Sequence, residues 1–148
     1  MNCIFFGHRE VGLELEFKLR AAIFLAVKCG ARHFYVGNNG GFDFLVERVL
    51  RDVVCENDEL EYSIVLSRID EQAIGGEQEA TVFCEGMERA LPRFAVSKRN
   101  DWLLKNADML IAYVSHRFSN CEKLLSRARK RGIRILNLAD KDLSFEPF

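Results

Sequence analysis

Short apolar runs alternate with longer amphipathic segments along most of this chain. A short continuous apolar run is typical of a strand buried on both faces of a parallel sheet, and apolar positions at steps of three and four residues predict a helix. The first pattern predicts five strands, at residues 3–6, 33–36, 61–66, 109–114 and 133–138.

Helical periodicity fills the segments between these strands. We expect the first helix to turn toward the core a stripe made of Leu13, Phe17, Ala21, Phe24 and Leu25. Gly30 should end that helix, because glycine closes a helix in the left-handed conformation at low cost. Further helices are expected at residues 42–53, 99–107 and 120–130. Residues 67–100 have weaker periodicity and predict one or two short helices among loops.

Strands that alternate with helices indicate parallel neighbours joined by helical crossovers. We therefore predict an α/β protein with a Rossmann-like, doubly wound, mainly parallel five-stranded sheet and helices on both faces. The chain has 148 residues, about half of them apolar, which suits a single domain over residues 1–148 with its own core.

Composition narrows the classes of partner. A net charge of −1 leaves no general excess of Lys and Arg, which disfavours nucleic acid and anionic membranes as partners. No apolar run approaches membrane-spanning length. The five cysteines are odd in number and widely separated, and the three histidines have no ligand spacing. We expect reduced thiols, no metal, no cofactor apart from a nucleotide-like ligand, and a cytoplasmic location.

Ligands of such sheets bind outside the carboxyl ends of the strands, so polar residues on those loops carry most weight. The first such segment is Gly7-His8-Arg9, where a glycine permits a close turn and an arginine suits phosphate or carboxylate. The second runs from Gly37 to Asp43 and includes Asn38, Asn39, Gly40 and Gly41. Its three glycines exceed the needs of a plain turn, and unhindered amides at a helix start favour an anion. Asp43 could cap that helix or bind a ribose hydroxyl.

Two later segments offer charged groups. Lys98 and Arg99 lie near the start of a predicted helix, where the dipole disfavours cations, which suggests a role other than helix stability. The alternative is an exposed basic pair with Asn100 as the N-cap. After the fourth strand, Ser119 is a candidate ligand contact or helix cap. Glu122 is a candidate catalytic carboxylate, although the first turn of a helix also favours a carboxylate for structural reasons.

These segments together resemble the SLOG superfamily of Rossmannoid nucleotide-ligand proteins, within it the YpsA-like (DUF1273) group, and more distantly the LOG phosphoribohydrolases and the DprA fold. The resemblance is carried by Phe6-Gly7-His8-Arg9, by residues 35–43, and by residues 97–102 leading to residues 107–114. It implies a pocket in which Gly7, Arg9, residues 37–43, Arg99 and Asn100 contact a nucleotide-derived ligand. The chain departs from its relatives at residues 115–120, where they commonly carry a Gly-Gly phosphate loop.

Three functions follow as hypotheses. The first is a nucleotide-ligand sensor or binding domain. The second is an N-glycosidic hydrolase of nucleoside monophosphates that uses Glu122. The resemblance gives Glu122 a place comparable to that of the catalytic glutamate of the phosphoribohydrolases, but without the glycines that precede it there. The third is an RNA- or protein-binding module that uses the basic cluster Lys123, Arg127, Arg129, Lys130, Arg131 and Arg134. The sequence also leaves room for a homo-oligomer through Phe83, Met87, Leu91 and Phe94, for which we favour ordinary core packing.

Overall fold

The computed structural model describes residues 1–8, 10–37, 40–66, 81–83, 92–115, 120–140 and 143–145. Strands and helices alternate through most of this part of the chain. The elements, in chain order, are β1 (Asn2–Gly7), α1 (Leu15–Lys28), β2 (His33–Val36), α2 (Gly41–Cys55), β3 (Glu61–Leu66), β4 (Thr81–Phe83), α3 (Pro92–Lys105), β5 (Met109–Tyr113), α4 (Asn120–Lys130) and β6 (Arg134–Asn137).

One parallel sheet organises the described residues. Its strand order is β4-β3-β2-β1-β5-β6, and each neighbouring pair is parallel. The chain starts at β1, adds three strands on one side, and returns to add β5 and β6 on the other side. The prediction of a Rossmann-like α/β fold is thus confirmed. The sheet has one strand more than predicted, because β4 has only three residues and is too short to give a periodic signal.

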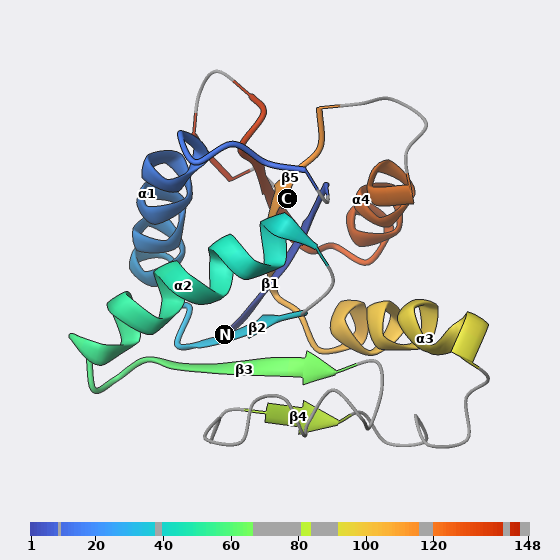
Figure 1. The fold of residues 1–148 in the computed structure, drawn as a ribbon, viewed down its shortest axis with the longest axis horizontal. Coiled ribbons are helices and arrows are strands. Elements are labelled where there is room, and N and C mark those ends of the chain that lie inside the picture. Colours follow the sequence, from blue (N-terminus) through green and yellow to red (C-terminus); the bar gives the residue numbers. More distant parts are fainter. Residues whose placement is uncertain are drawn as a thin grey trace.

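Two helical layers cover the sheet, and each has its own hydrophobic core. α1 and α2 pack on one face, against side chains such as Phe5, Phe34 and Ile111. α3 and α4 pack on the other face, against Ile4, Phe6 and their neighbours. Successive residues of β1 therefore point into opposite cores, as the period of two in a strand requires. Figure 1 shows the two pairs of helices on either side of the central strands.

The apolar face predicted for the first helix is wrong. α1 buries a different stripe, composed of Leu15, Leu19, Ala22, Ile23 and Ala26. The predicted residues Leu13, Phe17 and Phe24 are exposed. Both stripes have helical spacing, and periodicity alone does not distinguish them. The end of the helix is as predicted, because Gly30 adopts a positive φ of 111° just beyond α1.

The third helix begins earlier than predicted. α3 starts at Pro92, a residue that suits the first helical position. Lys98, Arg99 and Asn100 therefore lie in the middle of the helix and not ahead of it. The argument from an unfavourable dipole at a helix start does not apply to Lys98 and Arg99, and Asn100 is not an N-cap.

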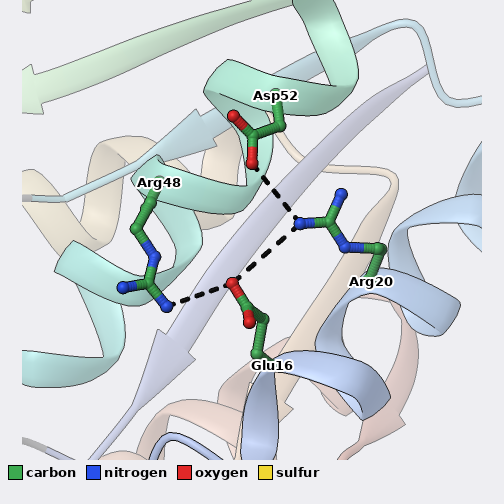
Figure 2. A network of polar contacts seen from close by, with 4 residues as sticks. All are labelled: Glu16, Arg20, Arg48 and Asp52. Atoms are coloured by element: carbon green, nitrogen blue, oxygen red, sulfur yellow. Dashed lines mark hydrogen bonds and ion pairs between the residues drawn. The ribbon is translucent and has the colours of Figure 1, made fainter.

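A ladder of charged side chains joins α1 to α2 on the outer surface (Figure 2). Arg48 Nη2 lies 3.0 Å from Glu16 Oε1, and Arg20 Nη2 lies 3.4 Å from Asp52 Oδ2. These two ion pairs are four residues apart on each helix, so α1 and α2 run side by side in the same direction. Exposed pairs of this kind contribute little to stability, typically about 0–1 kcal/mol each.

Candidate functional site

The strand order creates a switch point between β1 and β5. The two strands are neighbours, and Gly7 at the end of β1 pairs with Tyr113 at the end of β5. The chain then leaves β1 toward the α1 side and leaves β5 toward the α4 side. In open α/β sheets, ligands bind in the crevice outside the carboxyl ends of the strands at such a point. Side chains at this edge are therefore the candidates for a functional site.

His8 ties the two strand exits together. Its backbone N–H donates to the Tyr113 carbonyl at 3.3 Å, and its Nε2 accepts a hydrogen bond from the Ser115 N–H at 2.9 Å. The ring also packs edge-on against Tyr113, with 5.7 Å between ring centroids. An accepting Nε2 leaves the proton of the neutral imidazole on Nδ1. This candidate ligand residue thus has a structural role at the switch point.

Gly7 permits a close approach between β1 and α2. A Cβ placed on Gly7 would overlap the ring of Phe42, which is fully buried at the start of α2. The ring of Phe42 in turn stacks on Tyr113 at 6.4 Å. Gly7 therefore serves core packing beneath the site, and no side chain at this position is compatible with the present place of Phe42.

Gly37, Asp43 and Arg99 meet at the end of β2. A Cβ on Gly37 would lie 2.8 Å from Asp43 Oδ2 and 2.9 Å from Arg99 Nη1. Arg99 is only 4 % exposed although it belongs to the helical layer on the opposite face from Asp43. Its Nη2 donates to the Oδ1 of Asn100 at 3.3 Å. The structure thus brings together three residues that the sequence suggested separately, from β2, α2 and α3.

The start of α2 presents backbone N–H groups at the same edge. Gly40 occupies the N-cap with φ of 123°, a conformation that suits glycine, and Gly41 is the first helical residue. A glycine N-cap offers no side-chain oxygen to the N–H groups of the first turn. Amides at such a helix start favour an anion or a ligand oxygen.

The first turn of α4 lies near the first turn of α2. The pKa of the Cys121 thiol is raised, first by burial and also by the negative charge of Asp43. The thiol is therefore protonated at neutral pH, which disfavours a nucleophilic role. Glu122, the next residue, is half-buried. The candidate catalytic carboxylate thus belongs to the same edge of the molecule as Asp43.

The remaining candidate residues lie either on the surface or outside the described part of the chain. Lys98 is exposed on α3, on a different side of the helix from buried Arg99. Other candidates lie outside the described residues, namely Arg9, Asn38, Asn39 and Ser119. Met87 and Leu91 of the suggested oligomer face also lie outside them, and the side chains of Phe83 and Phe94 are not described.

Asn137 is a residue of this edge that sequence reasoning missed. Its Oδ1 accepts from the backbone N–H groups of Val114 and Ala139, each at 3.1 Å. Its Nδ2 donates to the Val114 carbonyl, also at 3.1 Å. The available signal was a polar residue that follows two buried apolar residues at the end of a strand. Asn137 holds the exit of β5 in place next to β6.

A second polar cluster lies between β2 and β3, at the His33 ring. His33 Nε2 lies 2.8 Å from Ser63 Oγ, and Nδ1 lies 3.5 Å from Glu61 Oε2. The ring stacks on Tyr35 with 4.2 Å between centroids. Burial lowers the pKa of His33, and the charge of Glu61 opposes this shift. The cluster lies toward the beginning of these strands, away from the carboxyl edge.

The basic cluster around α4 is partly engaged within the molecule. Arg127 forms an ion pair with Asp101 of α3. The guanidinium of Arg134 lies 5.7 Å from the centre of the Phe145 ring. These two members therefore fasten α4 and β6 to neighbouring segments.

No protein-family model matches the chain, and a search of curated proteins also finds no match. Within the described residues, no three His, Cys, Asp or Glu side chains gather closely enough to hold a metal ion. No helix in the described part of the chain is long and apolar enough to cross a membrane.

Proposed function

We propose that this protein binds a nucleotide or nucleotide-derived, phosphate-bearing ligand at the carboxyl ends of its strands, as a sensor or ligand-processing domain. The observation that carries the proposal is the buried guanidinium of Arg99 beside Gly37 and Asp43, next to the switch point. It supports a ligand with both anionic and hydroxyl groups.

The charge and shape of the Arg99 guanidinium support this interpretation. Burying a guanidinium is costly, and proteins retain such a group where it makes several directed hydrogen bonds. Its planar fork matches the oxygens of a phosphate, and α2 begins at the same edge with the backbone N–H groups that favour an anion at a helix start. Asp43 accepts hydrogen bonds and suits a sugar hydroxyl. The three groups together fit a ribose phosphate.

The resemblance to the SLOG superfamily supports the same ligand class. It rests on sequence segments that include Gly7, Gly37 and Arg99, and these residues all lie at the carboxyl edge in the structure. The choice of a nucleotide among phosphate-bearing ligands depends on that resemblance.

The affinity of Arg99 variants tests the proposal. Thermal-shift and calorimetric titrations with AMP, ADP-ribose and NAD should identify a compound that stabilises the protein. We expect Arg99→Lys and Arg99→Gln to weaken binding of that compound by about 10- to 100-fold, because the paired, charge-assisted hydrogen bonds of the guanidinium are lost. Lys105→Gln removes an exposed cation from the same helix and should bind as the wild type does. Equal affinities for all these proteins, or no binding of any compound, would refute the proposal.

Lys98→Ala tests the second cation separately. Lys98 is exposed one residue before Arg99, so its contribution to binding is expected to be smaller. A loss larger than that of Arg99→Gln would move the anion site toward the outer surface of α3.

A second candidate function is N-glycosidic hydrolysis of a nucleoside monophosphate. The observation that favours it is that α4 begins after β5, so Glu122 in its first turn lies at the carboxyl edge, where the charge of Asp43 reaches the neighbouring Cys121. Glu122 would stabilise an oxocarbenium-like centre while Arg99 holds the phosphate. Incubation with AMP, CMP and GMP should then release free base and ribose 5-phosphate, and Glu122→Gln should abolish release while AMP still binds. Binding without any released base leaves the sensor function.

A cytosolic location is part of the proposal. Four cysteines of the described residues are free, and Cys55 is exposed. Unpaired thiols are typical of a reducing compartment.

A further inference from the structure

α1 has a second apolar face, directly opposite the one it buries. Leu13, in the turn that leads into the helix, is 74 % exposed, Phe17 is 83 % exposed and Phe24 is 47 % exposed. Their spacing of four and seven residues places them in one row along the helix. Single exposed apolar residues are normal on a protein surface, but a row of large ones marks a contact site.

α2 extends this row sideways. Phe44 is 60 % exposed and lies one turn before Arg48 on the same side of α2. Because Arg48 contacts Glu16, Phe44 lies at the same end of the helix pair as Leu13. We call the surface formed by Leu13, Phe17, Phe24 and Phe44 the two-helix face.

The size of the two-helix face matches one side of a dimer interface. The exposed parts of three phenylalanines and a leucine amount to about 500 Å² of apolar surface. A standard interface buries about 800 Å² on each partner, and homodimer interfaces are about 65 % apolar. The four side chains therefore supply about the apolar area that one protomer contributes.

The charges around the face suit a second copy of the same chain. A two-fold interface brings a surface against itself, so a surface of one sign would repel its copy. Here the ladder of Figure 2 combines Glu16 and Asp52 with Arg20 and Arg48, and it has no net charge. Each sign on one copy can meet the opposite sign on the other. A strongly acidic or strongly basic partner would gain nothing from this arrangement.

We propose that the protein forms a two-fold symmetric dimer in which the two-helix faces of two copies pack against each other. The proposal does not depend on the proposed ligand, because it rests on the exposed side chains of the two-helix face and not on Gly37 or Arg99, although Phe44 follows Asp43 in α2. Phe17 and Phe44 are the expected centre of the interface, because they are the most exposed aromatic side chains of the face.

Sedimentation velocity over a range of protein concentrations tests the dimer. We expect the wild type to dimerise at micromolar concentration and Phe17→Ser/Phe44→Ser to weaken dimerisation by at least about 100-fold. Both substitutions are at exposed positions and should leave the fold of the monomer unchanged. Val96→Ser is the matched control, because it removes an exposed apolar side chain from α3, on the opposite face of the sheet.

Two results would overturn the proposal. One is a wild type that stays monomeric up to about 100 μM, far above the Kd expected for a standard interface. The other is a dimer that Phe17→Ser/Phe44→Ser leaves intact or that Val96→Ser disrupts equally, since either result places the interface elsewhere.

Discussion

Two glycines of the candidate site have different neighbours. A side chain at Gly7 would meet the ring of Phe42, which is fully buried in the core. A side chain at Gly37 would meet the carboxylate of Asp43 and the guanidinium of Arg99, the polar ends of two side chains and not an aromatic ring of the core. The same change from glycine to alanine should therefore affect stability at one position and binding at the other.

Gly7→Ala should lower the free energy of unfolding by about 1–3 kcal/mol, the usual cost of overpacking a core. Urea denaturation measures this loss. In the double variant Gly7→Ala/Phe42→Ala, the two losses should be less than additive, because removing the ring removes the overlap. Additive losses would show that Gly7 and Phe42 do not constrain each other.

Gly37→Ala should leave the free energy of unfolding within about 1 kcal/mol of the wild type but weaken ligand binding by about 10-fold or more, because Asp43 and Arg99 must move. Urea denaturation and calorimetric titration of the same preparation separate the two effects. Unchanged affinity would mean that the geometry around Gly37 does not matter to the ligand.

Among the helices, the buried face was predicted correctly where the sequence contains only one apolar stripe. α2 has a single apolar stripe that includes Val46, Val49 and Leu50, and these residues are buried as expected. α1 has two stripes, and the sheet selects Leu15 and Leu19 over Leu13 and Phe17. That selection depends on packing between distant parts of the chain, which local periodicity does not contain.

In the candidate site too, the sequence indicated individual residues but not the contacts between them. The sequence indicated Gly37, Asp43 and Arg99 individually, because strand ends and charges are visible in it. It placed Arg99 at a helix start, and the meeting of Arg99 with Asp43 across the sheet edge requires the tertiary fold. The role of Asn137 was not predicted, since its partners Val114 and Ala139 belong to the chain before and after it and the contacts are with backbone atoms.

Asn137→Ala should loosen the link between β5 and β6. The N–H and carbonyl groups of Val114 and the N–H group of Ala139 each lose a hydrogen bond to Asn137. We therefore expect the free energy of unfolding to fall by about 1–3 kcal/mol. Hydrogen exchange at the amides of Val114 and Ala139 should accelerate. Asn57→Ala, which removes one side-chain hydrogen bond at the end of α2, is the control and should cost less. Equal losses would contradict the role given to Asn137.

The pairing of β2 with β3 should make stability depend on pH through His33. Burial lowers the pKa of His33 below its ordinary value of 6.5, so the unfolded chain takes up the proton first as the pH falls. Stability is therefore fully present above pH 6.5 and decreases as the pH falls from there toward the folded pKa. Urea denaturation at pH 7.5 and 5.5 should show a smaller decrease for His33→Gln than for the wild type. An equal decrease in the two proteins would contradict this assignment.

At the scale of the whole molecule, the doubly wound topology explains why one edge gathers the candidate groups. Parallel strands all end at the same edge, and the return of the chain from β4 to β5 opens the switch point beside β1. α2 and α4 then begin at that edge from opposite faces, and α3 contributes Arg99. The two-helix face lies on the outer surface of α1 and α2, and Phe44, next to Asp43, brings the proposed dimer interface close to the carboxyl edge.

The most direct test of the central claim is to map bound ligand by amide chemical shifts in a titration with AMP or ADP-ribose. Binding at the carboxyl edge predicts the largest changes at the amides of Gly7, Gly37, Gly41 and Ser115, with small changes at His33 and Glu61 near the opposite ends of the strands. Changes centred on the basic cluster of α4, or at the opposite edge of the sheet, would contradict the claim, as would the absence of any change at millimolar ligand.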